Sequence, residues 1–455
     1  MTAQANLLDR PPADLVPNAA PGRVLPRPET RRRWSPYPAG VAVCATLAGS
    51  AVLQSGQGGP VWILWVCVLA SMAALSALGR PPTIMPAGRT LLVLGSVFAG
   101  FILYQALALP GWRGGIDAQT PAGPVTLNHL SFAPNATALG LLRVLGYLVF
   151  FWLVMQLAHS HRRARKLAMF VFALIAGQAV FAVLALTALG DIGFPGRKTA
   201  YLGAATGTFI NKNALAAYLG FGLVLGLALF GGQRAARHRP QTIAIRAIWL
   251  TILVALVLTS SRMGLAASSA GVVTVCLIRH PVALLSRVRA PHLLAGGMAA
   301  GLLALFLDPT SGSPLSTRTD LYRQVATMIA DRPLTGFGFD SFPLAFQLYH
   351  KVAVWPGVLW NNTHSSYLTL WVETGILAGS LPLVAGLLAM RSLWRRARLP
   401  AAGQSLAAAG LGALMLGALH STLDFSLENM ANAYVLLTLI ALGIGTPETT
   451  KGKRP

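Results

Sequence analysis

The chain has 455 residues, of which 54% are hydrophobic and only 11% are charged, and its mean hydropathy is +0.60. Soluble domains usually carry about a quarter of charged residues, so this composition excludes an ordinary soluble protein and predicts an integral membrane protein. The net charge of +23 does not indicate a nucleic-acid-binding protein, because Lys and Arg form short clusters between apolar runs instead of one basic surface.

The first 36 residues are rich in Pro, Ala and Arg and predict a disordered basic cytoplasmic tail. A cleavable signal peptide is not expected, because the first apolar run begins only near Ala39. The cysteines all lie inside apolar runs and lack the spacing of a zinc site or a disulfide framework.

Twelve apolar segments follow, each near the length of about 20 residues that a helix needs to cross a bilayer. They lie at approximately 37–55, 60–78, 90–109, 136–158, 167–189, 213–231, 246–260, 263–279, 293–307, 365–390, 404–420 and 431–447. The sequence therefore predicts an all-α integral membrane protein of about 12 transmembrane helices. Residues 37–307 hold the first nine spans, 308–364 form a large periplasmic loop, 365–447 hold the last three spans, and 448–455 form a second cytoplasmic tail.

Basic residues give the predicted orientation, because cytoplasmic loops carry an excess of Lys and Arg. With the N-terminus inside, 26 of the 36 Lys and Arg residues fall in the tails and the inner loops, so both termini are expected to be cytoplasmic. The others lie in outer loops or in the outer half of a span. They are Arg113, Arg143, Arg197, Lys198, Lys212, Arg262, Arg318, Arg323, Arg332 and Lys351.

Arg and Lys beside lipid on the outer face fit the recognition of a lipid-linked phosphate or pyrophosphate, to which Arg offers paired planar donors and Lys a point charge. Arg143 lies within the fourth predicted span and marks a functional site by default, because an Arg at that depth is costly. Two simpler interpretations stay open. Arg143 can extend outward to the interface, and the outer Arg residues can pair with Asp308, Asp320, Asp331 and Asp340.

The large loop has its own local signals. Apolar residues recur at helical spacing from Leu321 to Ile329, which predicts a short amphipathic helix lying on the membrane with its basic residues facing the headgroups. The Gly-Phe-Gly-Phe stretch at 336–339 predicts a turn followed by an aromatic plug. It is weak evidence for a phosphate-binding loop, because no Lys-Ser pair follows it.

Two histidines at predicted span ends are candidates for acid–base chemistry. His364 opens the tenth span, where an imidazole can titrate near neutral pH, although a lone His there is often only an interfacial residue. Glu373 lies nine residues later, on the opposite helix face and about 13 Å along the axis, so it is not the expected partner of His364. His420 and Asp424 are four residues apart, and Asp424 can orient His420 or cap the following helix.

Five motifs in order carry a resemblance to a known family. They are Gly207-Thr208-Phe209-Ile210-Asn211-Lys212-Asn213, Ser260-Ser261-Arg262, Asp331-Arg332-Pro333-Leu334-Thr335-Gly336-Phe337-Gly338, the stretch from His364-Ser365 to Glu373-Thr374-Gly375, and the stretch from His420 to Phe425. Over about residues 130–445 the chain resembles the O-antigen ligase and polymerase family. These are multi-spanning bacterial glycosyltransferases that act on undecaprenyl-pyrophosphate-linked glycans, and the resemblance implies a fold like that of C-type glycosyltransferases.

The resemblance also implies site residues. The functional His and outer Arg residues of the family correspond here to His364, Arg262 and Arg323. A further basic residue is expected near the first motif, and Lys212 is preferred to Arg197 or Lys198. With His364 and Arg262 as the catalytic pair, the pyrophosphate-binding candidates are Lys212, Arg323, Arg143 and Arg197, and the supporting residues are Asn211, Asn213, Gly336, Gly338, Glu373, His420 and Asp424. The family's ligase pattern holds through Gly375 but ends in Ala378, which slightly favours the polymerase reading.

The implied activity is glycosyl transfer without a metal or other cofactor at the periplasmic face of the bacterial inner membrane. The donor is an undecaprenyl-pyrophosphate-linked glycan, and the acceptor is a lipid A core or a growing polysaccharide. An O-antigen or exopolysaccharide polymerase, transfer to protein, a transporter or flippase, and a non-catalytic assembly subunit stay open as alternatives. A transporter is disfavoured, because the chain shows no two similar halves and only Glu373 is an acidic residue within a predicted span.

Overall fold

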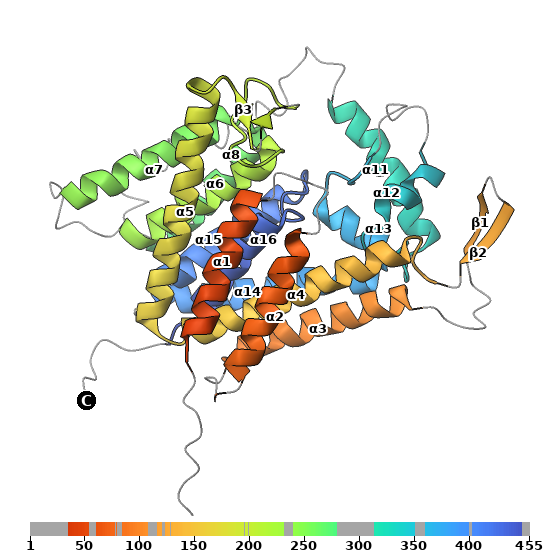
Figure 1. Ribbon diagram of the computed structural model, residues 1–455, viewed down its shortest axis with the longest axis horizontal. Helices are drawn as coiled ribbons and strands as arrows, with labels where there is room; N and C mark the ends of the chain where they lie inside the picture. The colour runs from red at the N-terminus through yellow and green to blue at the C-terminus, as the bar shows by residue number, and fades with distance from the viewer. Residues whose placement is uncertain are drawn as a thin grey trace, which may run out of the picture.

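In the computed structural model, the described residues are 35–53, 61–77, 79, 84–107, 116–120, 123–127, 129–194, 196–198, 200–231, 240–279, 314–350, 360–399 and 403–447. Helices make up most of them (Figure 1). The helices are α1 (Tyr37–Leu53), α2 (Val61–Ala77), α3 (Pro86–Ala106), α4 (Pro134–Ala158), α5 (His161–Thr187), α6 (Lys212–Phe230), α7 (Pro240–Leu258), α8 (Arg262–Arg279), α11 (Pro314–Asp331), α12 (Phe342–Ala345), the 3-10 helix η2 (Phe346–Leu348), α13 (Ser366–Gly379), α14 (Leu381–Arg398), α15 (Gln404–His420) and α16 (Met430–Gly445).

Two short antiparallel hairpins interrupt the helical pattern. One pairs β1 (Ile116–Thr120) with β2 (Gly123–Leu127), and the other pairs β3 (Ile192–Gly193) with β4 (Gly196–Arg197). The sequence did not predict them. The predicted helical class is confirmed, with these hairpins as small additions in the connections.

Six of the described helices, α3 to α8, are long and apolar enough to cross a membrane. α13 and α14 pass the same test together as a pair bent by 74°, and α1, α2, α15 and α16 are shorter apolar helices. These elements lie at predicted spans. The predicted span at 293–307 falls outside the described residues, so the total of twelve spans stays a prediction.

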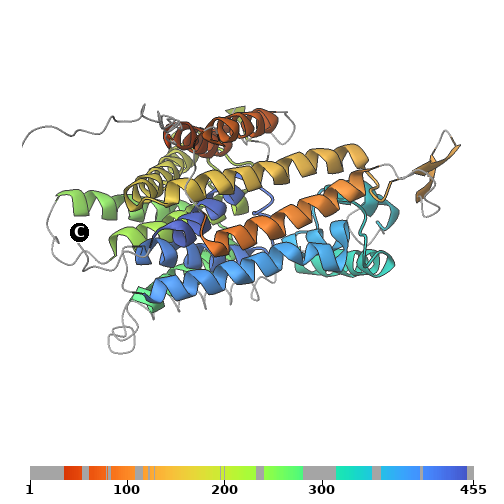
Figure 2. The same ribbon diagram turned by 90° about the horizontal axis from the view of Figure 1, so that it is seen from below.

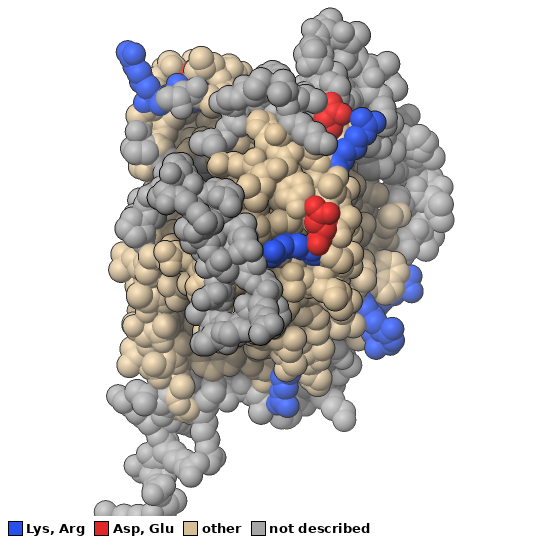
Figure 3. Space-filling view, turned by 90° about the vertical axis from the view of Figure 1, so that its right-hand side faces the viewer, with Lys and Arg blue, Asp and Glu red and all other residues tan. Residues whose placement is uncertain are grey.

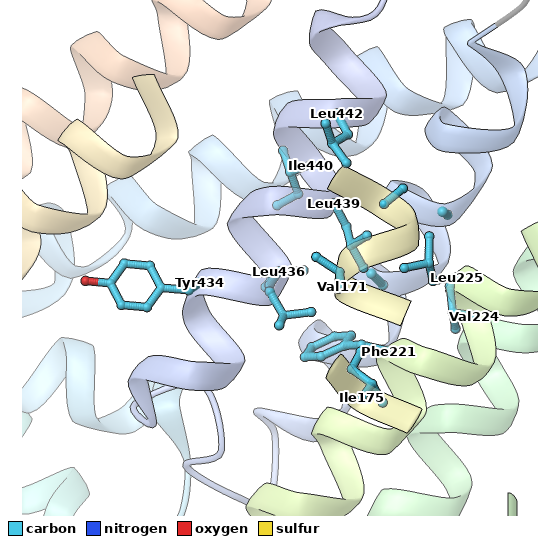
Figure 4. Close-up of a cluster of buried hydrophobic side chains, with 14 of the residues drawn as sticks. Val171, Ile175, Phe221, Val224, Leu225, Tyr434, Leu436, Leu439, Ile440 and Leu442 are labelled. Carbon is cyan, nitrogen blue, oxygen red and sulfur yellow. The ribbon is translucent and has the colours of Figure 1, made fainter. Parts of the chain in front are cut away.

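The main hydrophobic core surrounds α6. This helix is apolar on all sides, and its Tyr218 and Phe221 are fully buried. Figure 4 shows Phe221 among side chains of α5 and α16. Next to this core, α8 and α15 approach each other at Gly271 and Gly412, where a Cβ on Gly271 would lie 2.7 Å from the Gly412 carbonyl oxygen. Such close packing of helix backbones needs small residues at the contact.

The predicted tenth span, at 365–390, coincides with a bent pair of helices. Gly375, inside α13, has φ +73° and kinks this helix, and α13 and α14 meet at an angle of 74° across Ser380. The preceding loop docks its backbone at the Gly375 kink, where the Ile376 N–H donates to the Pro333 carbonyl at 2.7 Å. Only glycine adopts such a backbone conformation easily, and the loop carbonyl takes the place of a helical hydrogen-bond partner.

α11 confirms the helix predicted in the large loop, but the prediction that it lies on the membrane is wrong for its apolar face. Leu321, Val325 and Met328 are fully buried and pack with Phe337 and Phe342. The aromatic residues of the loop therefore supply the apolar partner of this helix. In Figure 1, α11, α12 and α13 form a group at the right of the long helices.

Connections between alternate helices meet at one end of the bundle, which we call the loop end. Tyr322 of α11 donates to the His364 carbonyl at 3.2 Å, and Arg318 donates to the carbonyl of Leu423, between α15 and α16, at 3.3 Å. Figure 2 shows α3, α4 and α14 running side by side, with α11 near their ends. These are the connections that the sequence predicts to be on the outer side.

Candidate functional site

A polar cluster lies at the loop end, where α6, α8 and α13 begin and α15 ends. We call it the His364 cluster and define it by Lys212, Asn213, Ser261, Arg262, Arg318, His364, His420 and Asp424. All but Ser261 and Arg318 are site residues predicted from the sequence. The structure therefore brings together residues from five separate parts of the chain.

Asp424 is the centre of the hydrogen bonding in this cluster. Its carboxylate accepts from Asn213 Nδ2 at 2.8 Å and from the Ser426 hydroxyl at 2.5 Å. Asn213 in turn accepts from the Ser261 hydroxyl at 2.8 Å. Asp424 is only 1% exposed, and these donors offset the penalty of burying a carboxylate. The start of α6, the start of α8 and the connection after α15 are thereby held together.

The start of α6 is set by a helix cap. The Asn211 side chain accepts from the Asn213 backbone N–H at 2.8 Å, which is the usual role of Asn at a helix N-cap. The supporting role predicted for Asn211 therefore has a local basis. Because α8 and α13 also begin in the cluster, three helix N-termini add their partial positive charge there.

Two cations lie side by side at these helix starts. Lys212 Nζ lies 3.3 Å from the Ser260 carbonyl and 5.9 Å from the ring centre of Tyr201. Arg262 opens α8 and is close enough for its charge to repel that of Lys212. Two neighbouring cations at helix N-termini suit an anion of more than one charge, since such an anion relieves their mutual repulsion.

His364 is held by its backbone and by aromatic rings. Its imidazole meets Trp360 and Phe425 edge to face, with ring centres 5.6 and 5.2 Å away. Its φ is +59°, a conformation that is uncommon for a residue with a side chain and that concentrates at functional sites. Its Nδ1 is buried and makes no hydrogen bond within the described part of the chain. The ring is thus positioned while one nitrogen stays unpaired.

The charge state of His364 follows from its surroundings. Burial lowers its pKa, the positive charge of Arg318 lowers it further, and Asp424 opposes the shift. The imidazole is therefore neutral near pH 7, which is the form that accepts a proton. Arg318 is fixed for this role by its hydrogen bond to the Leu423 carbonyl.

His420 lies beside Asp424 without a hydrogen bond. Its Nδ1 is 3.8 Å from Asp424 Oδ1, which is electrostatic contact rather than a hydrogen bond. Asp424 does not cap α16, because Asn429 does so by accepting from the Ala431 N–H at 3.1 Å, and that prediction is wrong. Among the described residues, no group of three or more His, Cys, Asp or Glu is arranged to hold a metal ion.

A cavity of about 1330 Å³ opens next to the cluster. We call it the α3–α14 cavity, because side chains of α3, α4 and α14 form much of its wall. Most of the wall is apolar, from Leu94 and Phe98 on α3 to Leu387 and Met390 on α14. One end is polar. That end is lined by Arg143, Asp340, Asn361, Asn362, Glu373 and Glu428.

Arg143 faces this cavity and pairs with Asp340. Its Nη2 lies 2.5 and 2.8 Å from the two carboxylate oxygens, and its guanidinium lies 5.6 Å from the ring centre of Phe339. Gly140, one helical turn earlier, leaves space for the Asp340 carboxylate, since a Cβ there would lie 2.6 Å from Asp340 Oδ2. In Figure 3, acidic side chains on the visible face lie beside basic ones. Arg143 therefore forms an ion pair with Asp340, one of the outer Asp residues that the sequence offers as partners.

Gly336, Gly338 and Glu373 dock the large loop onto α13. The Gly338 N–H donates to the Glu373 carbonyl at 2.8 Å, and Glu373 Oε1 accepts from the Phe342 N–H at 3.1 Å. A Cβ on Gly336 would lie 2.4 Å from the Glu373 backbone. Gly336 thus allows a close approach to the α13 backbone, whereas Gly338 leaves space for Ser131, since a Cβ there would lie 2.1 Å from the Ser131 hydroxyl oxygen. Glu373 holds the loop in place and, as expected, is not the partner of His364.

Two predicted basic residues lie apart from the cluster. The Arg323 side chain is 77% exposed and pairs with Asp320 of the same helix at 3.1 Å. Arg197 is exposed in β4, and its neighbour Lys198 binds Asp191 at 2.7 Å. Among the described contacts, nothing joins either Arg to His364.

The sequence analysis did not identify Arg318 or Glu428 as site residues. Arg318 and Arg323 lie on the same helix, and nothing in the sequence tells which of them faces His364. Glu428 is one of only 13 acidic residues and lies in a predicted outer connection, and this scarcity of acids is the signal that could have found it. Burial raises the pKa of Glu428 to about 7, against the opposing effects of the Thr369 hydroxyl and Arg143.

A comparison with known protein families covers part of this site. Residues 247–383 match the model of the family described as O-antigen ligase. The matched segment contains Arg262, Arg318 and His364 from the cluster and Asp340 and Glu373 from the cavity. A search of curated proteins gave no match. The family match confirms the resemblance to the O-antigen ligase family over residues 247–383, which contain three of the five sequence motifs.

Proposed function

We propose that this membrane protein is a glycosyltransferase that moves a glycan from an undecaprenyl-pyrophosphate carrier to an acceptor hydroxyl at the periplasmic face. The observation that carries the proposal is the grouping of Lys212, Arg262, Arg318 and a neutral His364 at one end of the bundle. The grouping offers cations for a pyrophosphate and a proton acceptor for a hydroxyl. The family match supports the same class of reaction.

The reaction is a displacement at the anomeric carbon of the donor sugar. The acceptor oxygen forms a bond to that carbon while the bond from the carbon to the pyrophosphate oxygen breaks. The bonding electrons leave with the pyrophosphate, whose growing charge Lys212, Arg262 and Arg318 stabilise. The neutral imidazole of His364 takes the proton that the acceptor hydroxyl loses. Charge and atoms balance without any further reactant.

A polymerase of the same family is the second candidate. It uses the same donor chemistry, but the acceptor is a sugar on a growing chain. The observation in its favour is Ala378, which stands where the ligase pattern of the family has Gly, Thr or Tyr. Ala378 is 7% exposed and lies one residue before the end of α13, so it belongs to the bent helix and not to the His364 cluster.

The test is a transfer assay with purified protein and a lipid-linked glycan donor. His364→Ala and Arg262→Ala are expected to abolish transfer while the protein stays inserted in the membrane. His159→Ala and Arg165→Ala are matched controls, because both residues lie where α4 ends and α5 begins, away from the cluster. Full activity of the two cluster variants would contradict the assignment, and absence of transfer by the unchanged protein would favour a transporter or an assembly subunit.

A deletion strain distinguishes ligase from polymerase. Loss of polymer from the lipid A core, with lipid-linked polymer retained, identifies a ligase. Single repeat units on the core identify a polymerase.

A further inference from the structure

The turn that presents His364 is held by the connection between α15 and α16. After His364, the Ser366 N–H donates to the Ser421 carbonyl of this connection at 3.1 Å. Before His364, Asn362, in the orientation of its amide that satisfies both atoms, donates to Glu428 Oε2 at 2.9 Å. Ser366 and Asn362 each lie two residues from His364. One connection therefore holds both ends of the turn.

The Thr363 side chain spans His364 from one neighbour to the other. Its hydroxyl donates to the Ser365 carbonyl at 2.7 Å and accepts from the Ser365 N–H at 3.2 Å. Thr363 is 0% exposed, and its hydroxyl lies 2.9 Å from that of Thr369, in the first turn of α13. His364 has φ +59°, and a residue with a side chain keeps such a conformation only where its surroundings hold it. The two hydroxyl groups are part of those surroundings.

The Glu428 carboxyl group meets this hydrogen-bond network at two points. It accepts from Asn362, and it lies beside the Thr369 hydroxyl. Burial raises the pKa of Glu428 to about 7, and the Thr369 hydroxyl opposes this shift by stabilising the charged form. The charges that shift the pKa of His364 belong to other residues of the cluster. Glu428 therefore acts on His364 through hydrogen bonds to its turn and not through its charge.

We propose that Glu428 is a positioning residue for the proton acceptor: its carboxyl group holds the His364 turn through Asn362 and Thr369 and binds neither substrate. This inference rests on the proposed function, because such positioning matters only if His364 takes a proton. The competing role is a direct contact with a substrate, since Glu428 also lines the α3–α14 cavity. The two roles differ in the kinetic constant that a substitution changes.

Two substitutions at Glu428 separate these roles in steady-state kinetics. Glu428→Leu removes both oxygens at similar volume and is expected to lower kcat at least about tenfold, because a reacting group is misplaced, with the KM of donor and acceptor within about twofold. Glu428→Gln keeps an oxygen that accepts from Asn362, so it should recover most of this loss. Asp320→Leu removes an exposed acid outside the network and should stay within about twofold of the unchanged protein.

Several kinetic outcomes would overturn the proposal. A raised KM for either substrate with an unchanged kcat would assign Glu428 to substrate binding. Equal losses for Glu428→Gln and Glu428→Leu would show that the charge of Glu428 is required and that its hydrogen bond is not.

Asn362 provides a test of the path between Glu428 and His364. Asn362→Leu is expected to lower kcat as well, and the variant with both Asn362→Leu and Glu428→Leu should be no slower than Glu428→Leu alone, because both residues act on the same turn. Losses that multiply would mean that the two residues act separately, which contradicts the proposed path.

The position of the His364 ring is measured without any activity by its reaction with diethyl pyrocarbonate, followed by mass spectrometry of the peptides. Glu428→Leu should raise the modification rate of His364 several-fold, because the ring is released from its aromatic neighbours. His159, which is exposed directly after α4, gives the reference rate, and His420, which is 1% exposed, reports a general loosening of the fold.

An unchanged rate at His364, or an equal rise at His420, would refute the positioning role of Glu428. Absence of transfer by the unchanged protein would instead contradict the proposed function, and the modification rates would still decide whether Glu428 holds the turn.

Discussion

Asn213 donates a hydrogen bond from its Nδ2 to Oδ2 of Asp424 at 2.8 Å, and the two residues are 211 positions apart in the chain. The contact joins the start of α6 to the connection between α15 and α16. It therefore ties the residue after Lys212 to the carboxylate whose charge reaches His364. The proposed pyrophosphate-binding and proton-accepting groups thus share one hydrogen-bonded support.

The first prediction separates two arginines of one helix. Arg318 touches the Leu423 carbonyl and influences His364, whereas Arg323 is exposed and pairs with Asp320. Arg318→Gln is expected to lower kcat/KM for glycan transfer by roughly 10- to 100-fold, because it removes a cation beside the leaving group. Arg323→Gln should stay within about twofold, as an exposed ion pair contributes little. A larger loss of kcat/KM for Arg323→Gln than for Arg318→Gln would indicate that Arg323 binds the pyrophosphate.

The second prediction concerns the acid limb of the pH–rate profile. His364 must be neutral to accept a proton, so the rate falls as the pH drops through its pKa. Arg318 lowers that pKa and Asp424 raises it. Arg318→Gln should therefore move the acid limb to higher pH, and Asp424→Asn should move it to lower pH. Shifts in the same direction for both variants would show that another group controls the profile.

The third prediction tests the kink at Gly375, inside α13. Gly375 has φ +73°, and a Cβ there would lie 2.4 Å from the Leu334 carbonyl oxygen. Gly375→Ala is expected to destabilise the fold by at least about 1–2 kcal/mol from the backbone conformation alone. Thermal unfolding in detergent, followed by the loss of helical circular dichroism, measures this. Gly386→Ala is the control, since its Cβ meets open space, and equal melting temperatures would contradict the prediction.

The fourth prediction concerns the pair formed by Arg143 and Asp340. Their side chains are 26% and 30% exposed, so each single change to Leu leaves a largely buried charge without its partner. Each single variant should lose about 1–3 kcal/mol of unfolding free energy, and the double variant should lose at least about 1 kcal/mol less than the sum. Additive losses in a double-mutant cycle would mean that the two charges do not depend on each other.

Local patterns in the sequence were sufficient for most helices and for the family. The apolar runs gave helices at the predicted places, because burial in a bilayer needs a long apolar segment and leaves a strong signal. His364 and Arg262 were chosen as candidates through motifs that carry their own spacing, and the structure places both in one cluster. The position of Lys212 could also be anticipated, since Asn211 is a recognisable helix cap.

Other features depend on contacts between distant segments, and no local pattern reports them. At the kink at Gly375 the Pro333 carbonyl, more than 40 residues earlier in the chain, accepts the hydrogen bond of Ile376 in place of a partner within the helix. α11 has the amphipathic pattern of a membrane-surface helix, and only the fold shows that Phe337 covers its apolar face. The partner of Arg143 lies 197 residues away, so its charge alone could not tell a binding site from an ion pair.

The bend between α13 and α14 also resolves a problem of length. A straight helix from Ser366 to Arg398 would be about 50 Å long at 1.5 Å per residue, against about 30 Å for the hydrocarbon layer. Its last turn carries Arg395 and Arg398, which are exposed and belong in water. With the bend, these arginines can reach one membrane surface. His364, just before the start of α13, then stays at the loop end, beside the polar end of the α3–α14 cavity. Any change that straightened the pair would push one of these two polar ends to the wrong depth.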